Sequence, residues 1–174
     1  LREINSDIVA WLYCPDTQIN YPVVKGTDND FYLTHALDRS WNDNGSIFMD
    51  YRGVADFSDP NNILYGHHMK TGAMFAVLIK YKEQSFYDAH PTMYLLTPQQ
   101  NYQLNLFSGT IVPSNDEIYS SHVSLEHIKE CTDNSTFTAK TDIPTDHPVL
   151  TLSTCSYEFK NARYVVLAEI VPMT

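Results

Sequence analysis

A thiol and a guanidinium stand where two successive strand patterns meet near the C-terminus. Residues 149–155 (Val-Leu-Thr-Leu-Ser-Thr-Cys) are branched and apolar, follow Pro148, and predict a β-strand that ends on Cys155. A polar connection follows, and residues 164–171 form a second strand pattern directly after Arg163. If these strands pair as an antiparallel hairpin, Cys155 and Arg163 become neighbours at its mouth. A guanidinium beside a thiol favours the reactive thiolate and can hold a developing oxyanion, so the pair indicates nucleophilic catalysis.

Two adjacent histidines supply a candidate general acid and base. Residues 62–69 (Asn-Ile-Leu-Tyr-Gly-His-His-Met) predict a strand that runs from Ile63 to His67. Neighbours on a strand point to opposite faces, so the residues alone leave open whether His67 or His68 would face a groove. The remaining histidines fall in loop or exposed-helix patterns and are expected at the surface: His35, His90, His122, His127 and His147.

Together these segments resemble the sortase signature, in which one strand ends in Gly-His, another ends in Thr-Leu-x-Thr-Cys, and an Arg opens the next strand. Tyr-Gly-His-His-Met at residues 65–69, a helix-like run and a long segment before the Cys strand are most similar to class B of that family. The resemblance spans nearly the whole chain. It implies a mostly β protein with added helices (α+β), in which a closed sortase-type barrel carries a helix-containing long loop before the Cys strand.

The activity that the resemblance implies is that of a cysteine-type transpeptidase. The Cys155 thiolate would attack the carbonyl carbon of a Thr in a C-terminal sorting motif. His67, the His directly after Gly, would protonate the leaving amine and then deprotonate the incoming one. Arg163 and the backbone N–H of Ser156 would stabilise the oxyanion. No cofactor and no metal are implied.

Four further side chains are expected along the substrate groove. The resemblance matches Asn29 and Leu33 to positions that face the sorting peptide, and Ser153 to a position used in binding. Ser153 also has the strand parity of Cys155. Tyr65 has the parity of the catalytic His and would line the same wall, with a buried core tyrosine as the equal alternative.

One departure from the family concerns a carboxylate. Some class B members carry an acidic residue one or two positions after the Cys, whereas here Ser156 and Tyr157 stand in those places and Glu158 comes third. No catalytic carboxylate is therefore assigned.

The implied partners are a sorting-motif peptide of a secreted surface protein and an amine acceptor from a peptidoglycan precursor or a pilin. The family includes enzymes for Asn-Pro-x-Thr motifs, enzymes that favour Pro-x-Thr-Gly variants, and pilus polymerases, and the residues do not choose among them. The implied location is the extracellular face of the membrane of a Gram-positive bacterium. The enzyme is expected to be a monomer. No apolar run here approaches the ~20 residues of a membrane span, and the resemblance implies an N-terminal membrane anchor ahead of this sequence.

Two other functions stay open on the residues. An L,D-transpeptidase-like cysteine acyl transferase is the enzymatic alternative, although its thiol motif normally has Gly directly before the Cys, where this chain has Thr154. The other alternative is a catalytically inactive surface-binding β-barrel that keeps a relic of the site.

The composition suits one ordered domain over residues 1–174. A hydrophobic content of 43% favours a packed core, and the net charge of −10 argues against binding to nucleic acid or to an anionic membrane surface. Cys14 and Cys131 could pair as a disulfide, but their places at the ends of helix-like runs favour two separately buried thiols. No clustered Cys/His spacing suggests zinc.

Apart from the strands already named, the patterns predict the following elements. Ile4, Ile8, Trp11 and Leu12 recur at helical spacing, which predicts an N-terminal helix packed on the barrel over residues 1–16. Strands are expected at 19–24, where Pro22 favours a sheet edge, and at 46–49, 92–97 and 101–112. Helical segments are expected at 31–33, 74–81 and 124–131.

Overall fold

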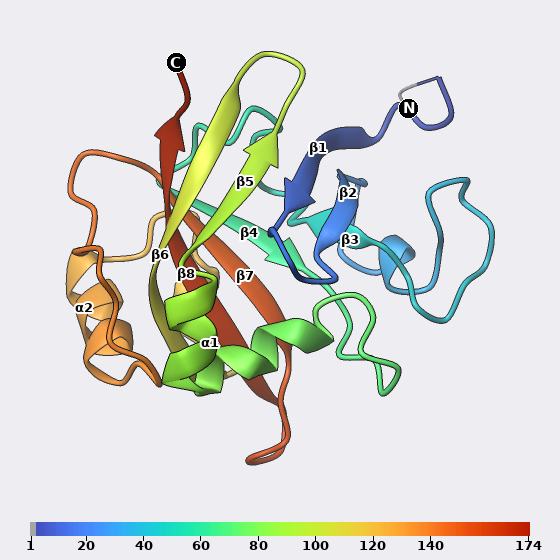
Figure 1. Cartoon of the computed structure of the whole chain (residues 1–174). Coiled ribbons are helices and arrows are strands. Elements are labelled where there is room, and N and C mark those ends of the chain that lie inside the picture. Colours follow the sequence, from blue (N-terminus) through green and yellow to red (C-terminus); the bar gives the residue numbers. More distant parts are fainter. Residues whose placement is uncertain (1–2) are drawn as a thin grey trace.

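Residues 3–174, which the computed structural model describes, contain eight strands that close into a barrel (Figure 1). The strands are β1 (Ile8–Tyr13), β2 (Asn20–Val24), β3 (Ile47–Met49), β4 (Asn61–Tyr65), β5 (Thr92–Leu96), β6 (Asn101–Pro113), β7 (Val149–Cys155) and β8 (Ala162–Pro172). Around the barrel they lie in the order β1-β2-β3-β4-β7-β8-β6-β5. The pairs β2–β3 and β4–β7 are parallel, and the other neighbours are antiparallel. The predicted mostly β class with a closed barrel is confirmed.

The interior of the barrel holds the main hydrophobic core. Successive residues of β7 and β8 point alternately inward and outward. Leu152 and Val166 pair across these strands and are completely buried in that core. Val165, the next residue along β8, belongs to a separate cluster on the outer face. Outward-facing side chains of β7 and β8 therefore lie outside the barrel core, where they meet the segments that cover the barrel.

The connection between β2 and β3 packs against residues of β1 to β4. Residues 25–46 include the 3-10 helix η1 (Phe31–Leu33), as predicted. The ring of Tyr32 packs in a small cluster with Phe48 of β3 and is 1% exposed. This connection lies at the right of Figure 1.

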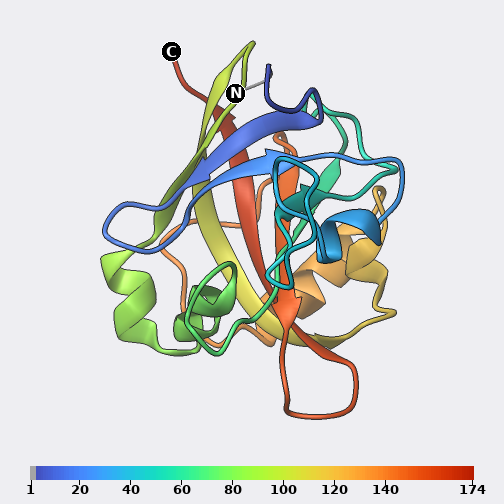
Figure 2. The same ribbon diagram turned by 90° about the vertical axis from the view of Figure 1, so that its right-hand side faces the viewer.

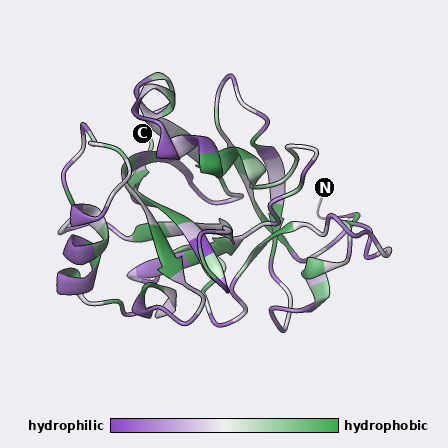
Figure 3. Ribbon diagram, turned by 90° about the horizontal axis from the view of Figure 1, so that it is seen from below, coloured by the Kyte–Doolittle hydropathy of each residue, from purple (hydrophilic) through white to green (hydrophobic). Residues whose placement is uncertain are grey.

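The connection between β6 and β7 covers the outer face on the other side. Residues 114–148 include the 3-10 helix η3 (Glu117–Tyr119) and the helix α2 (Leu125–Asp133). Ile128 of α2 packs in the same outer cluster as Val165. Seen from below, α2 is mostly hydrophilic at the left of the molecule, whereas the central strands are mostly hydrophobic (Figure 3). No helix in the described part of the chain is long and apolar enough to cross a membrane.

Two further helices follow β4 and cover the lower end of the barrel in Figure 1: η2 (Ala76–Lys82) and α1 (Gln84–Ala89). Val77, Leu78 and Tyr81 are buried in the main core, as expected for the helix predicted at 74–81. α1 was not predicted, because six residues are too few to show a helical period.

The predicted N-terminal helix is wrong. Residues 8–13 form β1, which pairs with β2 on one side and β5 on the other, and residues 1–2 lie outside the described part of the chain. Ile4, which completed the helical spacing, is 65% exposed. The backbone hydrogen bonds to β2 and β5, together with the burial of Leu12 in the barrel, stabilise the strand more than the local sequence favours a helix.

η3 was not predicted. The other elements agree with the predicted ranges within one or two residues, with two differences. β4 ends at Tyr65, so Gly66, His67 and His68 follow the strand instead of closing it. β2 pairs with both β1 and β3, so it is not an edge strand. The pairing with β3 begins only at Val23, so Pro22 is not required to donate a backbone hydrogen bond to β3. Cys14 and Cys131 are both buried and free, so the disulfide alternative is wrong.

Candidate active site

Strand register brings the three predicted catalytic side chains to one level on the outer face of the barrel. Cys155 of β7 lies directly opposite Arg163 of β8, which confirms the predicted hairpin. Directly opposite residues of an antiparallel pair project to the same face. On the other side of β7, Tyr65 of β4 pairs with Ser153. His67 lies two residues after Tyr65, and Cys155 lies two residues after Ser153, so His67 and Cys155 stand at the same level. The hydrogen bond from the Gly66 N–H to the Ser153 carbonyl, 3.2 Å long, carries the pairing past the end of β4.

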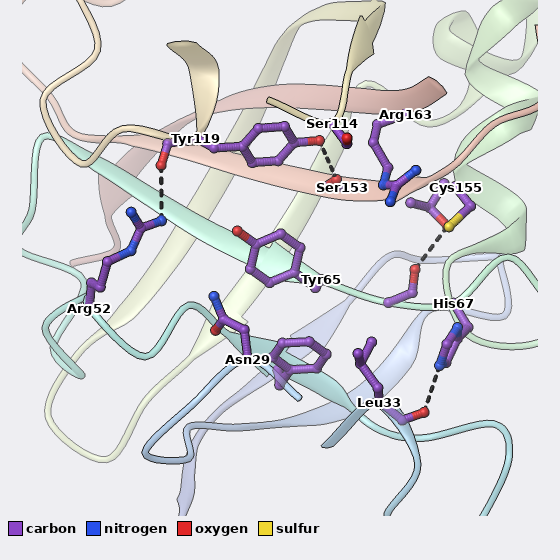
Figure 4. A pocket seen from close by; sticks show the side chains of 13 residues that line it. Asn29, Leu33, Arg52, Tyr65, His67, Ser114, Tyr119, Ser153, Cys155 and Arg163 are labelled. Carbon is purple, nitrogen blue, oxygen red and sulfur yellow. Dashed lines mark hydrogen bonds between the residues drawn. The ribbon is translucent and has the colours of Figure 1, made fainter. Parts of the chain in front are cut away.

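These side chains line a pocket of about 360 Å³ between the two long connections (Figure 4). All four side chains predicted along the groove also line it: Asn29 and Leu33 from the connection between β2 and β3, Tyr65 from β4 and Ser153 from β7. Ser156 does not line it. The residues that line the pocket are Asn29, Leu33, Phe48, Arg52, Tyr65, Gly66, His67, Ser114, Tyr119, Ser153, Thr154, Cys155 and Arg163.

The two adjacent histidines have different surroundings. His67 lines the pocket, and its Nε2–H donates to the Leu33 carbonyl at 2.6 Å, because a carbonyl can only accept. In a neutral ring this leaves Nδ1 to accept a proton. His68 instead donates from Nδ1 to the Cys155 carbonyl at 3.1 Å, and its ring lies against Tyr157. His67 is therefore the histidine that belongs to the pocket.

The carbonyl of Ala162 orders the groups at the hairpin mouth. It accepts from Arg163 Nη1 at 3.0 Å and from the backbone N–H of Ser156 at 3.0 Å. The Ser156 N–H is thus already engaged, and the residue is 5% exposed. Its predicted part in binding the oxyanion does not fit this geometry, because the hairpin ladder uses the donor.

Ser156 instead anchors the loop that follows Cys155. Its hydroxyl donates to the carboxylate of Glu158 and accepts from Lys82 Nζ at 3.2 Å, while Lys82 and Glu158 form an ion pair. The hydrogen bonds from Lys82 and Ser156 lower the pKa of Glu158 to about 2. These contacts tie the loop to η2, and this loop extends beyond the end of the barrel in Figure 2.

A buried carboxylate joins several groove residues. Asp50 is 2% exposed and accepts from Asn29 at 3.0 Å, from the Tyr65 hydroxyl at 2.9 Å and from two guanidinium nitrogens of Arg52 at 2.8 Å. Burial alone would raise the pKa of Asp50, but these hydrogen bonds outweigh it and hold the pKa at about 2. The charged pair therefore fixes Asn29 and Tyr65 on one wall of the pocket.

The opposite wall is tied to the floor by a tyrosine. The Tyr119 hydroxyl lies 2.8 Å from Ser153 Oγ, and the Tyr119 carbonyl accepts from Arg52 at 3.2 Å. Burial raises the pKa of Tyr119 to about 12. Its ring stacks on that of Tyr65 with centroids 6.1 Å apart, so the two walls meet through one pair of rings.

Sequence reasoning missed six of the lining residues: Phe48, Arg52, Gly66, Ser114, Tyr119 and Thr154. Asp50 directly after β3, with Arg52 two residues later, was the one local signal of a charged turn. No pattern in residues 114–148 distinguished Tyr119, because only the tertiary fold brings it over β7.

Comparison with known proteins identifies the family. A model described as "Sortase domain" matches residues 12–171. Sortase B of Listeria monocytogenes is 33% identical over 180 residues, which cover 98% of this chain and 72% of that protein. A solved sortase B of Staphylococcus aureus has a TM-score of 0.93 at 33% identity, over 99% of this chain and 83% of the other. Sortase B of Clostridium perfringens has a TM-score of 0.89 at 32% identity, over 98% and 97%.

These matches are to sortases in sequence and in structure, so the L,D-transpeptidase alternative is wrong. The family model extends from the end of β1 into β8, and 33% identity to sortase B continues along nearly the full chain. The chain therefore belongs to the sortase family, and within it to class B, the sortase B type of cysteine transpeptidase.

Proposed function

We propose that this sortase cleaves a sorting peptide after a Thr and transfers the acyl group to an amine. The Cys155 thiolate attacks the Thr carbonyl carbon, a carbon–sulfur bond forms, and the carbonyl π electrons move to oxygen. When the tetrahedral intermediate collapses, the peptide C–N bond breaks. His67, as an imidazolium, gives a proton to the leaving amine. The product of this half-reaction is a thioester on Cys155.

The second half-reaction regenerates the thiolate. The acceptor amine attacks the thioester carbon, and His67 takes the proton that the amine loses. A new amide bond forms as the carbon–sulfur bond breaks. His67 acts through Nδ1, since Nε2 donates to the Leu33 carbonyl. In both halves the oxyanion accepts from the Arg163 guanidinium, whose orientation is maintained by its contact with the Ala162 carbonyl.

One observation carries these roles: Cys155, Arg163 and His67 come from neighbouring parts of the sheet, stand at one level, and line one pocket. A thiol, an imidazole and a guanidinium together supply a nucleophile, a proton carrier and a site for negative charge.

The substrate is a sorting-motif peptide that lies along the pocket, with Asn29, Leu33, Tyr65 and Ser153 on its walls and floor. The relative from Staphylococcus aureus has been solved as a sortase B–substrate complex, and a sortase B has been solved in complex with triglycine. By this likeness we propose a glycine amine as the first acceptor to test, with a pilin lysine as the second. The chain acts as one catalytic domain at the outer face of the cell membrane.

A panel of fluorogenic peptides tests the proposal. The peptides carry Asn-Pro-x-Thr or Pro-x-Thr-Gly motifs, each offered with triglycine or with a lysine peptide, and products are identified by mass spectrometry. We expect one motif to be cleaved after Thr, and the acyl group to appear on one amine. His67→Ala lowers kcat by at least about 100-fold, whereas His68→Ala keeps most of the activity because its ring lies outside the pocket.

Thiol labelling separates an inactive barrel from an enzyme tested with the wrong peptide. Cys155 is partly exposed, whereas Cys14 and Cys131 are buried. An active-site thiolate is expected to react with a thiol reagent at neutral pH faster than an ordinary exposed thiol does, and Cys155→Ala removes that fast phase. If Cys155 reacts no faster than the two buried thiols, the nucleophile role is wrong.

A further inference from the structure

Three side chains with metal-ligating atoms meet away from the active-site pocket, where α2 packs beside β6 (Figure 1). Asp116, His127 and Cys131 bring a carboxylate oxygen, a ring nitrogen and a sulfur within 4.8 Å of one another. His127 and Cys131 are four residues apart on α2 and so project from one face of the helix. His127 was expected at the surface, but its side chain is only 17% exposed.

The two ring nitrogens of His127 have separate partners. Nε2 lies 2.5 Å from Asp116 Oδ1, inside the cluster, and Nδ1 lies 3.4 Å from Glu130 Oε2 on the outer side. A histidine that binds a metal usually directs its other N–H to a carboxylate, which fixes the tautomer and the ring orientation. Glu130 is in place to do this. The nitrogen left for a ligand is then Nε2, the one that faces Asp116.

The cluster is short of positive charge. Asp116 and Glu130 both form their ion pairs with the single imidazole of His127. Glu117, next to Asp116, adds a third carboxylate whose hydrogen bonds come from the neutral Ser124. The thiol of Cys131 is buried beside them, with 4% of the residue exposed. A divalent cation would balance this charge.

Solvent reaches the cluster through a cavity. A space of about 240 Å³ is lined by Asp116, His127, Glu130 and Cys131, together with residues of β6 and Asn134. This volume admits an ion and leaves room for water to complete its coordination.

We propose that Asp116, His127 and Cys131 bind a divalent transition-metal ion, with Zn²⁺ preferred and water as the fourth ligand. Sulfur, imidazole nitrogen and carboxylate oxygen are the ligand types that Zn²⁺ takes in tetrahedral sites. In such a site the ligand atoms stand roughly 3.5 Å apart, so small side-chain rotations close the present arrangement. Metal–sulfur, metal–nitrogen and metal–oxygen bonds form as the Cys131 thiol proton and any proton on His127 Nε2 leave to solvent.

The position suggests what the ion does. Asp116 is the N-cap of η3, where its carboxylate accepts from the Ile118 N–H at 2.8 Å. The same short helix ends at Tyr119, which forms a wall of the active-site pocket. A metal held by Asp116 and by two residues of α2 joins these helices and steadies that wall from behind.

Cobalt spectroscopy tests the site in the untagged chain with the change Cys155→Ala, so that the active-site thiol cannot contribute. We expect one equivalent of Co²⁺ to produce a thiolate-to-metal charge-transfer band, Zn²⁺ to displace the Co²⁺, and excess Mg²⁺ to leave the band unchanged. Zn²⁺ should also raise the melting temperature. Absence of a saturable charge-transfer band would overturn the proposal without any further mutation.

Variants assign the ligands. Cys131→Ser should abolish the band. Glu130→Gln should weaken Co²⁺ binding by about 10-fold or more, because it replaces the carboxylate that pairs with the other nitrogen of His127 by a neutral amide. His122→Ala is the matched control, since this exposed histidine lies outside α2 and should keep full binding. Unchanged Co²⁺ spectra in Cys131→Ser would show that the metal is bound elsewhere.

Discussion

Arg163 has a side chain whose planar shape matters as much as its charge. Nη1 of its guanidinium donates to the Ala162 carbonyl, so the other guanidinium nitrogens can donate to an oxyanion. The ammonium of a lysine is a single point charge on a flexible stem, and it cannot hold both contacts in one plane.

We therefore predict that Arg163→Lys lowers kcat/KM by about 100-fold or more, the size of effect seen when an oxyanion donor is removed. Steady-state kinetics on the best peptide of the panel measure this. Arg39→Lys is the control: Arg39 pairs with Asp7 away from the pocket, and its replacement should leave the rate near that of the parent. A near-normal rate for Arg163→Lys would show that the fork is not used.

Asp50 is the second residue with a clear energetic role. Its pKa falls from 3.8 to about 2 on folding. A lowered carboxylate pKa stabilises the fold fully above the unfolded value of 3.8, and this contribution is lost as the pH falls toward 2. The size of the shift corresponds to about 2 kcal/mol of unfolding free energy at neutral pH.

Asp50→Asn should therefore unfold at lower urea concentration at pH 7, with a loss of about 2 kcal/mol, and the gap to the parent should narrow between pH 4 and pH 2. Asp133→Asn, at the exposed end of α2, serves as the control and should change little. If the gap between Asp50→Asn and the parent stays constant with pH, the carboxylate is not the source of the stability.

At the scale of elements, one hydroxyl contact joins Tyr119, in the connection between β6 and β7, to the floor of the active-site pocket. The Tyr119 hydroxyl and Ser153 Oγ lie 2.8 Å apart, and Ser153 is 2% exposed. Removing the hydroxyl leaves the serine without this partner, which costs about 1–3 kcal/mol for a buried polar group. The wall would then move more freely, while the reacting groups of β7 and β8 keep their places.

Tyr119→Phe is thus predicted to raise KM several-fold and to change kcat little, because substrate binding depends on the wall and chemistry does not. Initial rates over a range of peptide concentrations separate the two constants. Tyr13→Phe, on β1 outside the pocket, is the matched control. A fall in kcat with unchanged KM would mean that Tyr119 acts on the chemical step instead.

The elements that carry the candidate catalytic residues were predictable because their local and tertiary preferences agree. β7 and β8 are apolar and branched, are joined by a short polar loop, and bury both faces, so the hairpin and the Cys155–Arg163 pairing followed from the residues. β1 was not predictable in this way. Its apolar residues satisfy a helical period as well as a strand, and only the partners β2 and β5 decide between them.

The walls of the pocket were harder to predict than its floor. Floor residues such as Ser153 share a strand with Cys155, so parity alone orients them. Tyr119 and Arg52 reach the pocket from irregular segments, where side-chain direction depends on distant contacts such as that between Arg52 and the Tyr119 carbonyl. The cluster of Asp116 with His127 and Cys131 was invisible for the same reason, since part of it comes from outside α2.

At the scale of the whole molecule, the barrel and its attached segments pack through a close contact on β6. A Cβ atom at Gly109 would lie 2.4 Å from the Tyr164 hydroxyl oxygen and 2.7 Å from a ring carbon of Phe137. Tyr164 belongs to β8 next to Arg163, and its hydroxyl lies 2.7 Å from Thr136 Oγ1 in the β6–β7 connection. The missing side chain of Gly109 therefore lets the barrel and this connection meet.

Gly109→Ala should lower the unfolding free energy by about 1–3 kcal/mol, the usual cost of an extra methyl group in a filled core. It should also reduce turnover, because displacement of Tyr164 shifts the strand that presents Arg163. Gly26→Ala is the matched control, since a Cβ atom there meets only ordinary contacts 3.4 Å from the Tyr32 ring. Urea unfolding and peptide cleavage measured on both variants decide the matter: equal stability and equal rates would mean that the barrel tolerates the added methyl group without moving β8.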